Sequence, residues 1–343
     1  MRFFLSLIIS SFFITGFFLV PFINFLYQSK FLRRYQETDD FQGKRTPIFD
    51  KFNRKKVGTP IGAGILLVFI ITILFGVTFF FLKNSHQYIS SCFPIGKEVS
   101  IIFFTLISFG LLGFLDDYKK IFDIKKRGVF GLRLRHKFLL QWLLAFIIAA
   151  LLYFGLDISI INIPFFGVFD IGFFYFPLAA FIIVAFTNAF NITDGQDGLA
   201  GGLLIFCLLA FSIISFQIFD TPLTIFSAIW IGSLIAFLYF NVYPARVFLG
   251  DTGALAFGAT IAVIGLLLGK IIALTIIGGI FIIEALSSLI QILSKLFFKK
   301  AILPVSPLHL WLRKIGWEEP KIVARAWLAG IMLAVFGLWL ATF

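Results

Sequence analysis

A chain of 343 residues in which 60% are apolar and only 13% are charged is too hydrophobic for a water-soluble globular domain. Its mean hydropathy is +1.03. Its apolar runs are about twenty residues long, the length with which a helix crosses hydrocarbon, so a polytopic helical membrane protein is indicated. The net charge of +12 lies in loops between these runs. There it favours a role in topology and in attracting anionic lipids or substrates, and it argues against nucleic-acid binding.

The apolar runs predict an all-α fold of ten membrane-spanning helices in a single domain, residues 1–343. The first run is too long for the apolar part of a signal peptide and lacks a small-residue cleavage site, so it is interpreted as a retained helix. Gly269 and Lys270 are expected to form the short turn between the eighth and ninth spans. The expected spans are residues 3–28, 59–82, 99–115, 138–156, 173–190, 199–219, 222–240, 252–269, 271–297 and 322–342.

Basic residues are concentrated in the first and third loops, whereas the second and fourth loops carry only Lys83 and Lys97. Because Lys and Arg are enriched in cytoplasmic loops, the odd-numbered loops are expected in the cytoplasm and both termini outside it. The nine basic residues of the first loop are Lys30, Arg33, Arg34, Lys44, Arg45, Lys51, Arg54, Lys55 and Lys56. The eight of the third loop are Lys119, Lys120, Lys125, Lys126, Arg127, Arg133, Arg135 and Lys137.

The polar clusters of the chain all fall on this expected cytoplasmic side. A transporter would place ionisable groups near the membrane midplane, where both sides can reach them. One-sided clustering instead favours an enzyme that works at the inner leaflet. The clusters are Asp116-Asp117, residues 188–202, residues 241–253 and residues 309–319.

Two adjacent carboxylates, Asp116 and Asp117, end the third span in the sequence F-L-D-D-Y-K-K. Neighbouring helical residues point about 100° apart, so one carboxylate can face a metal ion while the other faces a substrate. The two charges repel each other, and a divalent cation would relieve the repulsion. An ordinary polar helix end followed by lysines explains the pair equally well.

The segment N-A-F-N-I-T-D-G-Q-D-G-L-A-G-G, residues 188–202, lies between two apolar runs. Ionisable residues at membrane depth are costly and mark functional sites. Asp194 and Asp197 share a face if a helix has begun there. Gly195 and Gly198 keep the turn tight and give a ligand access to backbone N–H groups.

Three further residues extend the pattern. Asp251, in V-F-L-G-D-T-G-A-L, begins the eighth span, where a helix N-terminus favours an anion such as phosphate. An N-cap aspartate is the alternative interpretation. Glu284 falls inside the ninth span and is interpreted as bonding a neighbouring helix or lining a cavity. His309 follows in S-P-L-H-L-W, on a loop expected in the cytoplasm.

Five aspartates on one side of the membrane, with lysines and glycine-flanked turns, indicate metal-assisted phosphate chemistry. The chain has no Walker A lysine loop, so ATP hydrolysis is not supported. The residues by themselves therefore predict a Mg²⁺-dependent phosphotransferase that acts on a lipid.

At this point the motifs resemble those of the polyprenyl-phosphate N-acetylhexosamine-1-phosphate transferases, a family with ten helices and both ends outside the cytoplasm. The motif at residues 316–327 favours the muramoyl-pentapeptide branch over the N-acetylglucosamine-1-phosphate branch. That branch usually carries three consecutive histidines where this chain reads His309, Leu310 and Trp311. The matching motifs are residues 55–64, 116–118, 188–201, 244–255 and 316–327, in family order.

The resemblance implies a role for each matching residue. Asp251 would bind Mg²⁺, Asp116 would act as base or nucleophile towards the lipid phosphate, and Asp117 would support the metal or lipid site. With His309 these three are the expected catalytic residues. The uridine would be held by Lys56, Asn191, Asp197 and Phe248, the last by stacking. The polar cleft would be completed by Lys137, Asp194, Asn241 and His309.

The expected reaction moves phospho-N-acetylmuramoyl-pentapeptide from its UDP carrier to undecaprenyl phosphate in the bacterial plasma membrane and releases UMP. The nearest alternative is transfer of N-acetylglucosamine-1-phosphate, and a more distant one is a transporter without enzymatic activity. The resemblance also implies a homodimer.

Overall fold

The computed structural model describes residues 1–34, 54–84, 89–122 and 131–343. Within them, ten helices are long and apolar enough to cross a membrane, which confirms the predicted number of spans. They are α1 (Arg2–Gln28), α3 (Ala63–Asn84), α4 (Ile95–Phe122), α5 (Leu134–Ala150, continued by a π-helical turn, Leu151–Gly155), α6 (Tyr175–Thr193), α7 (Leu199–Gln217), α8 (Thr221–Asn241), α9 (Gly250–Leu267), α11 (Gly279–Phe297) and α13 (Glu319–Ala341).

The remaining elements are short. They comprise the 3-10 helices Arg54–Lys56 and Gly172–Phe174, the helices α10 (Ile271–Ile277) and α12 (Leu308–Lys314), and the strands β1 (Ile160–Ile163) and β2 (Gly167–Asp170). The two strands form an antiparallel hairpin in which Ile160 pairs with Asp170. No strand was predicted in this loop.

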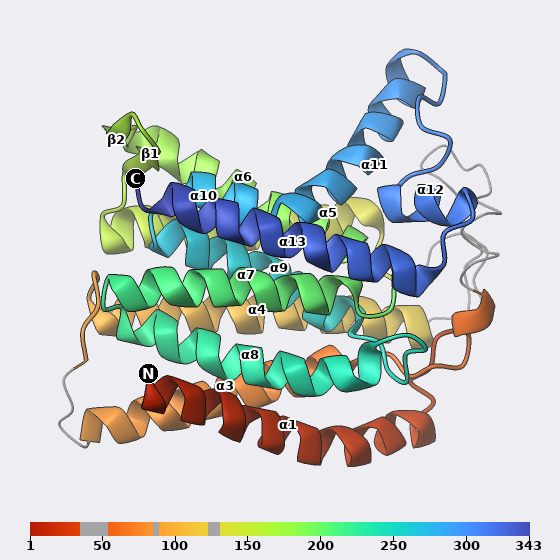
Figure 1. Ribbon diagram of the computed structural model, residues 1–343, viewed down its shortest axis with the longest axis horizontal. Coiled ribbons are helices and arrows are strands. Elements are labelled where there is room, and N and C mark those ends of the chain that lie inside the picture. The colour runs from red at the N-terminus through yellow and green to blue at the C-terminus, as the bar shows by residue number, and fades with distance from the viewer. Residues whose placement is uncertain (35–53, 85–88, 123–130) are drawn as a thin grey trace.

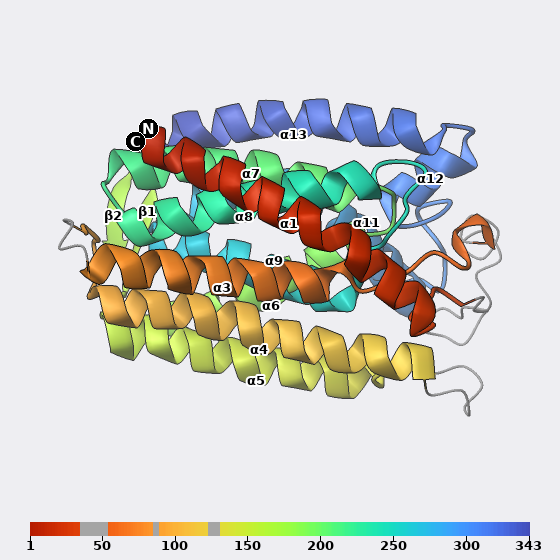
Figure 2. The same cartoon turned by 90° about the horizontal axis from the view of Figure 1, so that it is seen from below.

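The long helices run side by side, and α11 leaves the bundle at a steep angle (Figure 1). Both termini and the β1–β2 hairpin lie at one end of the bundle, while α12 lies at the opposite end (Figures 1 and 2). We call the α12 end the cavity end. Six of the basic residues behind the topology prediction lie outside the described residues: Lys44, Arg45, Lys51, Lys125, Lys126 and Arg127.

Three local expectations need correction. Helix α4 runs to Phe122, so Asp116 and Asp117 lie within it. The positive charges of Lys119 and Lys120 in its last turn interact favourably with the helix dipole and stabilise this extension. Asp194 to Gly198 form a turn between α6 and α7, so the two aspartates of this turn do not share a helical face. The expected ninth span is two helices, α10 and α11, separated at Gly278. The turn at Gly269 is confirmed.

Helix α9 is the centre of the bundle, because every residue from Thr252 to Leu267 is buried. Neighbouring backbones approach its first turn closely. A Cβ added to Gly113 of α4 would overlap the backbone of Asp251, and one added to Gly64 of α3 would overlap that of Gly253. Small residues allow such close helix packing within a membrane. The packing places the start of α9 against the last turns of α4.

Candidate active site

A cavity of about 400 Å³ opens at the cavity end of the bundle. Nine of the eleven predicted site residues line it: Lys56, Asp117, Asn191, Asp194, Asp197, Asn241, Phe248, Asp251 and His309. The other two, Asp116 and Lys137, are not lining residues but contact each other, and Lys137 also pairs with Asp251. Segments that are far apart in the sequence therefore meet at one place.

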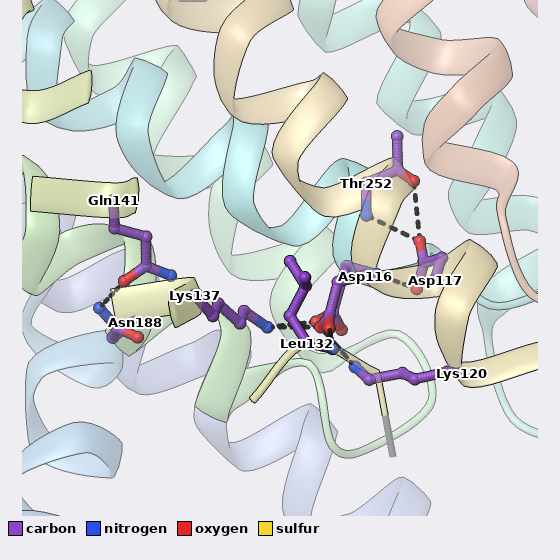
Figure 3. A network of polar contacts seen from close by, with 9 residues as sticks. Asp116, Asp117, Lys120, Leu132, Lys137, Gln141, Asn188 and Thr252 are labelled. Atoms are coloured by element: carbon purple, nitrogen blue, oxygen red, sulfur yellow. Dashed lines mark hydrogen bonds and ion pairs between the residues drawn. The ribbon is translucent and has the colours of Figure 1, made fainter. Parts of the chain in front are cut away.

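On one side of the cavity, two carboxylates share two lysines. The Nζ atom of Lys120 lies 3.0 Å from Asp116 Oδ2 and 2.8 Å from Asp251 Oδ2. The Nζ atom of Lys137 lies 2.9 Å from Asp116 Oδ2 and also pairs with Asp251. Figure 3 shows Lys120 and Lys137 approaching Asp116 from opposite sides. We call these four residues the carboxylate–lysine wall.

Asp117 connects this wall to the start of α9. Its Oδ1 accepts a hydrogen bond from the backbone N–H of Asp251 at 2.9 Å. Its Oδ2 accepts from the backbone N–H of Thr252 at 2.8 Å and from the Thr252 hydroxyl at 2.7 Å (Figure 3). Asp117 thus caps helix α9, which has no side-chain cap of its own. The side chain of Asp251 pairs with Lys120 and Lys137 instead.

Asp116 has a second partner that positions α5. Its Oδ1 accepts a hydrogen bond from the backbone N–H of Leu132 at 2.7 Å (Figure 3). Leu132 lies just before α5, which carries Lys137 in its first turn. The same carboxylate therefore orders the beginning of α5 and pairs with the lysine that α5 provides.

A second part of the cavity is supported by Glu319, at the start of α13. Glu319 Oε1 accepts hydrogen bonds from Lys56 Nζ at 2.6 Å and from the backbone N–H of Asp197 at 2.8 Å. Lys56 Nζ also lies 2.6 Å from Asp197 Oδ1, and Arg313 Nη1 donates to Glu319 Oε2 at 2.8 Å. We call Lys56, Asp197, Arg313 and Glu319 the Glu319 wall.

Asn241 holds the α6–α7 turn against the segment that leads into α9. Its side-chain oxygen accepts a hydrogen bond from the backbone N–H of Gly198 at 3.1 Å. Its amide group donates to the carbonyl oxygen of Val247 at 2.9 Å. Both polar groups of Asn241 are thus used within the protein, which favours a supporting role over direct binding of a ligand.

Phe248 presents its ring to the cavity between two cations. The Arg33 guanidinium lies 5.3 Å and the Lys56 ammonium 5.7 Å from the ring centroid. Arg33 is brought there by backbone pairing, since its N–H donates to the carbonyl of Thr59 and its carbonyl accepts from the N–H of Gly58, both at 2.9 Å. The Phe248 N–H donates to the carbonyl of Pro60 at 2.8 Å. An aromatic ring with adjacent cations suits a planar, anionic ligand.

The remaining predicted residues lie at the turn and at α12. Burial raises the pKa of the Asp194 carboxyl well above its usual range; the charge of Asp251 adds to this, while Lys56 and Arg33 oppose it. Asn191, at the end of α6, lines the cavity. His309 is 2% exposed, and its Nδ1 lies 3.0 Å from Glu284 Oε2. This confirms that Glu284 bonds a neighbouring element.

Sequence reasoning missed five cavity-side residues: Arg33, Arg34, Lys120, Gln196 and Glu319. Lys120 stands four residues after Asp116, a spacing that places both on one helical face, so this signal was available. Arg33 and Arg34 were interpreted through topology alone. Glu319 lies in the quoted motif at residues 316–327, but nothing local indicates that its side chain meets Lys56.

The oxygen ligands at the carboxylate–lysine wall suit a hard divalent cation. Among the described residues, no group of three or more His, Cys, Asp or Glu side chains could hold a metal ion by itself. Mg²⁺ binds proteins through one or two carboxylates together with water and substrate phosphates. Asp251 fits that pattern because it borders the cavity. Ligation by Asp117, whose oxygens already accept three hydrogen bonds, stays a prediction.

Comparison with known proteins places the chain in a family. Residues 99–269, which span the helices from α4 to α9, match the model of glycosyl transferase family 4. A phospho-N-acetylmuramoyl-pentapeptide-transferase of Bacillus pumilus is 39% identical over 289 residues, which cover 84% of this chain and 85% of that protein. Enzymes of the same name from Bacillus subtilis and Rickettsia montanensis are 37% and 35% identical, over 84% and 90% of this chain and 86% of each relative. The chain therefore belongs to glycosyl transferase family 4 and, within it, to the phospho-N-acetylmuramoyl-pentapeptide transferases.

Proposed function

We propose that the chain transfers phospho-N-acetylmuramoyl-pentapeptide from its UDP carrier to undecaprenyl phosphate, giving a lipid-linked sugar and UMP. One observation carries the proposal: nine predicted site residues line one cavity, and the Asp116–Asp251 cluster lies at its wall. The names of the similar enzymes agree with this activity.

The two walls suit the two halves of the reaction. The Glu319 wall and Phe248 would bind the uridine of the donor, since Lys56 and the Phe248 ring line the cavity together. Asp116 would act on the acceptor phosphate, as base or nucleophile, with Lys120 and Lys137 available to bind phosphate oxygens. Asp251 would hold Mg²⁺, which when bound would neutralise the pyrophosphate and stabilise the leaving group.

We further propose that the cavity end faces the cytoplasm of a bacterial plasma membrane. Basic side chains border this end, including Arg33, Arg34, Lys120 and Lys137, as expected for the inner side of a membrane. This orientation would be tested by supplying the donor to inside-out and right-side-out vesicles. Turnover only in right-side-out vesicles would contradict the cytoplasmic orientation of the cavity end.

A homodimer is also proposed, on the resemblance alone, and cross-linking in native membranes would test it.

The decisive test supplies undecaprenyl phosphate and Mg²⁺ with one UDP-linked donor at a time and measures release of UMP. We expect UMP from the muramoyl-pentapeptide donor and little from UDP-N-acetylglucosamine. Asp251→Ala should abolish release. Asp157→Asn is the matched control, because this exposed aspartate lies beyond α5 at the end opposite the cavity and has a positive φ that asparagine tolerates. The reverse donor preference would instead support transfer of N-acetylglucosamine-1-phosphate. Absence of UMP with every donor would refute an enzyme of this class.

Two of the three positions at which the family branch usually has histidine do not line the cavity. Pro307 and His309 line the cavity, whereas Leu310 and Trp311 are not among its lining residues. Leu310 is buried and Trp311 half-buried. The two substitutions therefore leave the polar lining of the cavity intact, which supports keeping the muramoyl-pentapeptide donor as the first choice.

A further inference from the structure

One face of α11 carries a line of polar residues at positions 284, 287, 291 and 294, a spacing that repeats every seven residues. Each of them bonds the segment 300–309, which crosses that face. Ser294 donates to the carbonyl of Lys300 at 2.9 Å, and Gln291 makes two hydrogen bonds with the backbone of Leu303. The Ser287 hydroxyl accepts from the N–H of Leu308 at 3.0 Å. These hydrogen bonds hold the segment that leads to His309 against helix α11.

Glu284 is the last member of this line and the one that reaches a side chain. Its Oε1 accepts from the backbone N–H of His309 at 3.2 Å, and its Oε2 lies 3.0 Å from the ring Nδ1. Both residues are buried, at 5% and 2% exposure. An ionised Glu284 carboxylate would only accept hydrogen bonds, and the Nδ1 atom of His309 would then be the donor. Two bonds to the same residue restrict both the backbone and the ring.

The other ring nitrogen, Nε2, lies at the α6–α7 turn. A Cβ added to Gly195 would be only 2.7 Å from it, so this glycine leaves room for the imidazole. The carbonyl oxygen of His309 accepts a hydrogen bond from Gln196 of the same turn at 3.3 Å. Gly195, Gln196 and His309 all line the cavity. With the backbone groups and Nδ1 held from behind, Nε2 is the ring atom presented on the cavity side.

We infer that Glu284 is a positioning residue for His309: it fixes the Nδ1–H form of the imidazole and directs Nε2 towards the donor substrate. A carboxylate that orients an imidazole in this way sets which ring nitrogen carries the proton. This inference rests on the proposed function, because it assigns a task to the same cavity. It also accounts for the buried carboxyl group of Glu284 within α11.

The test uses the small number of histidines. The chain has only three, so ¹⁵N NMR of histidine-labelled protein gives three sets of ring signals, and His309→Asn assigns the set of interest. The wild-type spectrum should show the Nδ1–H form for His309. In Glu284→Gln the amide can donate as well as accept, so we expect a shift towards the Nε2–H form. We also expect kcat to fall about tenfold to a hundredfold, the usual effect of losing such an orienting group.

Gln291→Ala is the matched control, because it removes hydrogen bonds from the same helix to the same segment without touching the imidazole. It should leave the His309 nitrogen signals in place. Glu284→Asp keeps a carboxylate and should retain the Nδ1–H form in part, and it replaces the Gln variant should that variant fail to fold. The Nε2–H form in the wild type would overturn the inference, as would unchanged nitrogen signals and unchanged kcat in Glu284→Gln. Absence of turnover in the wild type would count against the proposed function alone, since the NMR result does not depend on activity.

Discussion

The two walls of the cavity contain similar residues in different surroundings. In the Glu319 wall the side chains of Lys56, Asp197 and Glu319 are 8%, 4% and 2% exposed. In the carboxylate–lysine wall Lys120 is 31% exposed, and Lys137 and Asp251 are 12% and 13% exposed. Arg313 of the Glu319 wall is 18% exposed, and Asp116 of the carboxylate–lysine wall is 2% exposed. The centre of the Glu319 wall is therefore the more deeply buried network, whereas Lys120 gives the carboxylate–lysine wall its main exposure to water.

This difference indicates two tasks. Removing one member of a buried ion pair leaves an uncompensated charge, so the Glu319 wall must be complete for the fold to be stable. Lys120 is the most exposed member of the carboxylate–lysine wall, so water screens its ion pairs most and it can exchange a carboxylate for a phosphate at the lowest cost. On the proposed function, the Glu319 wall would provide a fixed shape for the donor, while the carboxylate–lysine wall would provide charges that rearrange during the reaction. Four predictions test this contrast, from the largest effect to the smallest.

The largest effect is expected on turnover from the carboxylate–lysine wall. Asp251→Ala should lower kcat by about 10³-fold or more, because a cation-based stabilisation of several kcal/mol is lost. The thermal midpoint in detergent should change little, since Lys120 and Lys137 keep Asp116 as a partner. Activity and melting would be measured on the same preparation. A collapse of the melting temperature would show that this wall, too, is needed for the fold.

In the Glu319 wall we expect a larger effect on stability than on turnover. Glu319→Gln should destabilise the protein by about 3 kcal/mol, because Lys56 and Arg313 lose a buried carboxylate. Chemical unfolding in detergent micelles would measure this. Glu318→Gln changes the exposed neighbour by the same chemistry and should have almost no effect. Equal stability of the two variants would refute the distinction between the walls.

Asp117 joins the carboxylate–lysine wall to the fold, so its replacement should affect both properties moderately. Asp117→Asn keeps one acceptor oxygen and loses part of the cap on α9, which should cost about 1–2 kcal/mol. Turnover should also fall, because the backbone of Asp251 is no longer held. Thr252→Val removes only the hydroxyl donor and should cost about 1 kcal/mol. A larger loss of stability from the Val variant would contradict the capping role.

The smallest effect concerns pH. Because burial raises the pKa of Asp194, the native protein holds this proton at pH values where the unfolded chain has released it. Stability from this group should therefore fall as pH rises from about 4, where an unfolded aspartate titrates, through the raised native pKa. Asp194→Asn imitates the protonated form, so its melting temperature should depend less on pH between 5 and 9. The same pH slope in both proteins would show that Asp194 is ionised in the native state.

Much of the fold followed from local pattern. The sequence predicted the ten spans and the turn at Gly269, and it contained the motifs that line the cavity. This was possible because hydrophobic length and residue type are properties of short segments. The places where the predictions were wrong are also local. The helical continuation past Asp117 and the break at Gly278 depend on dipole and packing effects that apolar runs do not report.

The partners of the site residues were a different matter. Lys56 meets Glu319 across 263 positions of the chain, and Asp117 caps a helix that begins more than a hundred residues later. Sequence alone determined which chemical groups this protein has and that they gather near the ends of its spans. Only the tertiary structure decided that Asp117 holds a backbone, that Glu284 holds His309 and that the centre of one wall is more deeply buried than the other wall. The physical reason is that pairing and burial depend on how helices pack, and the close approach of α3, α4 and α9 is a property of all three together.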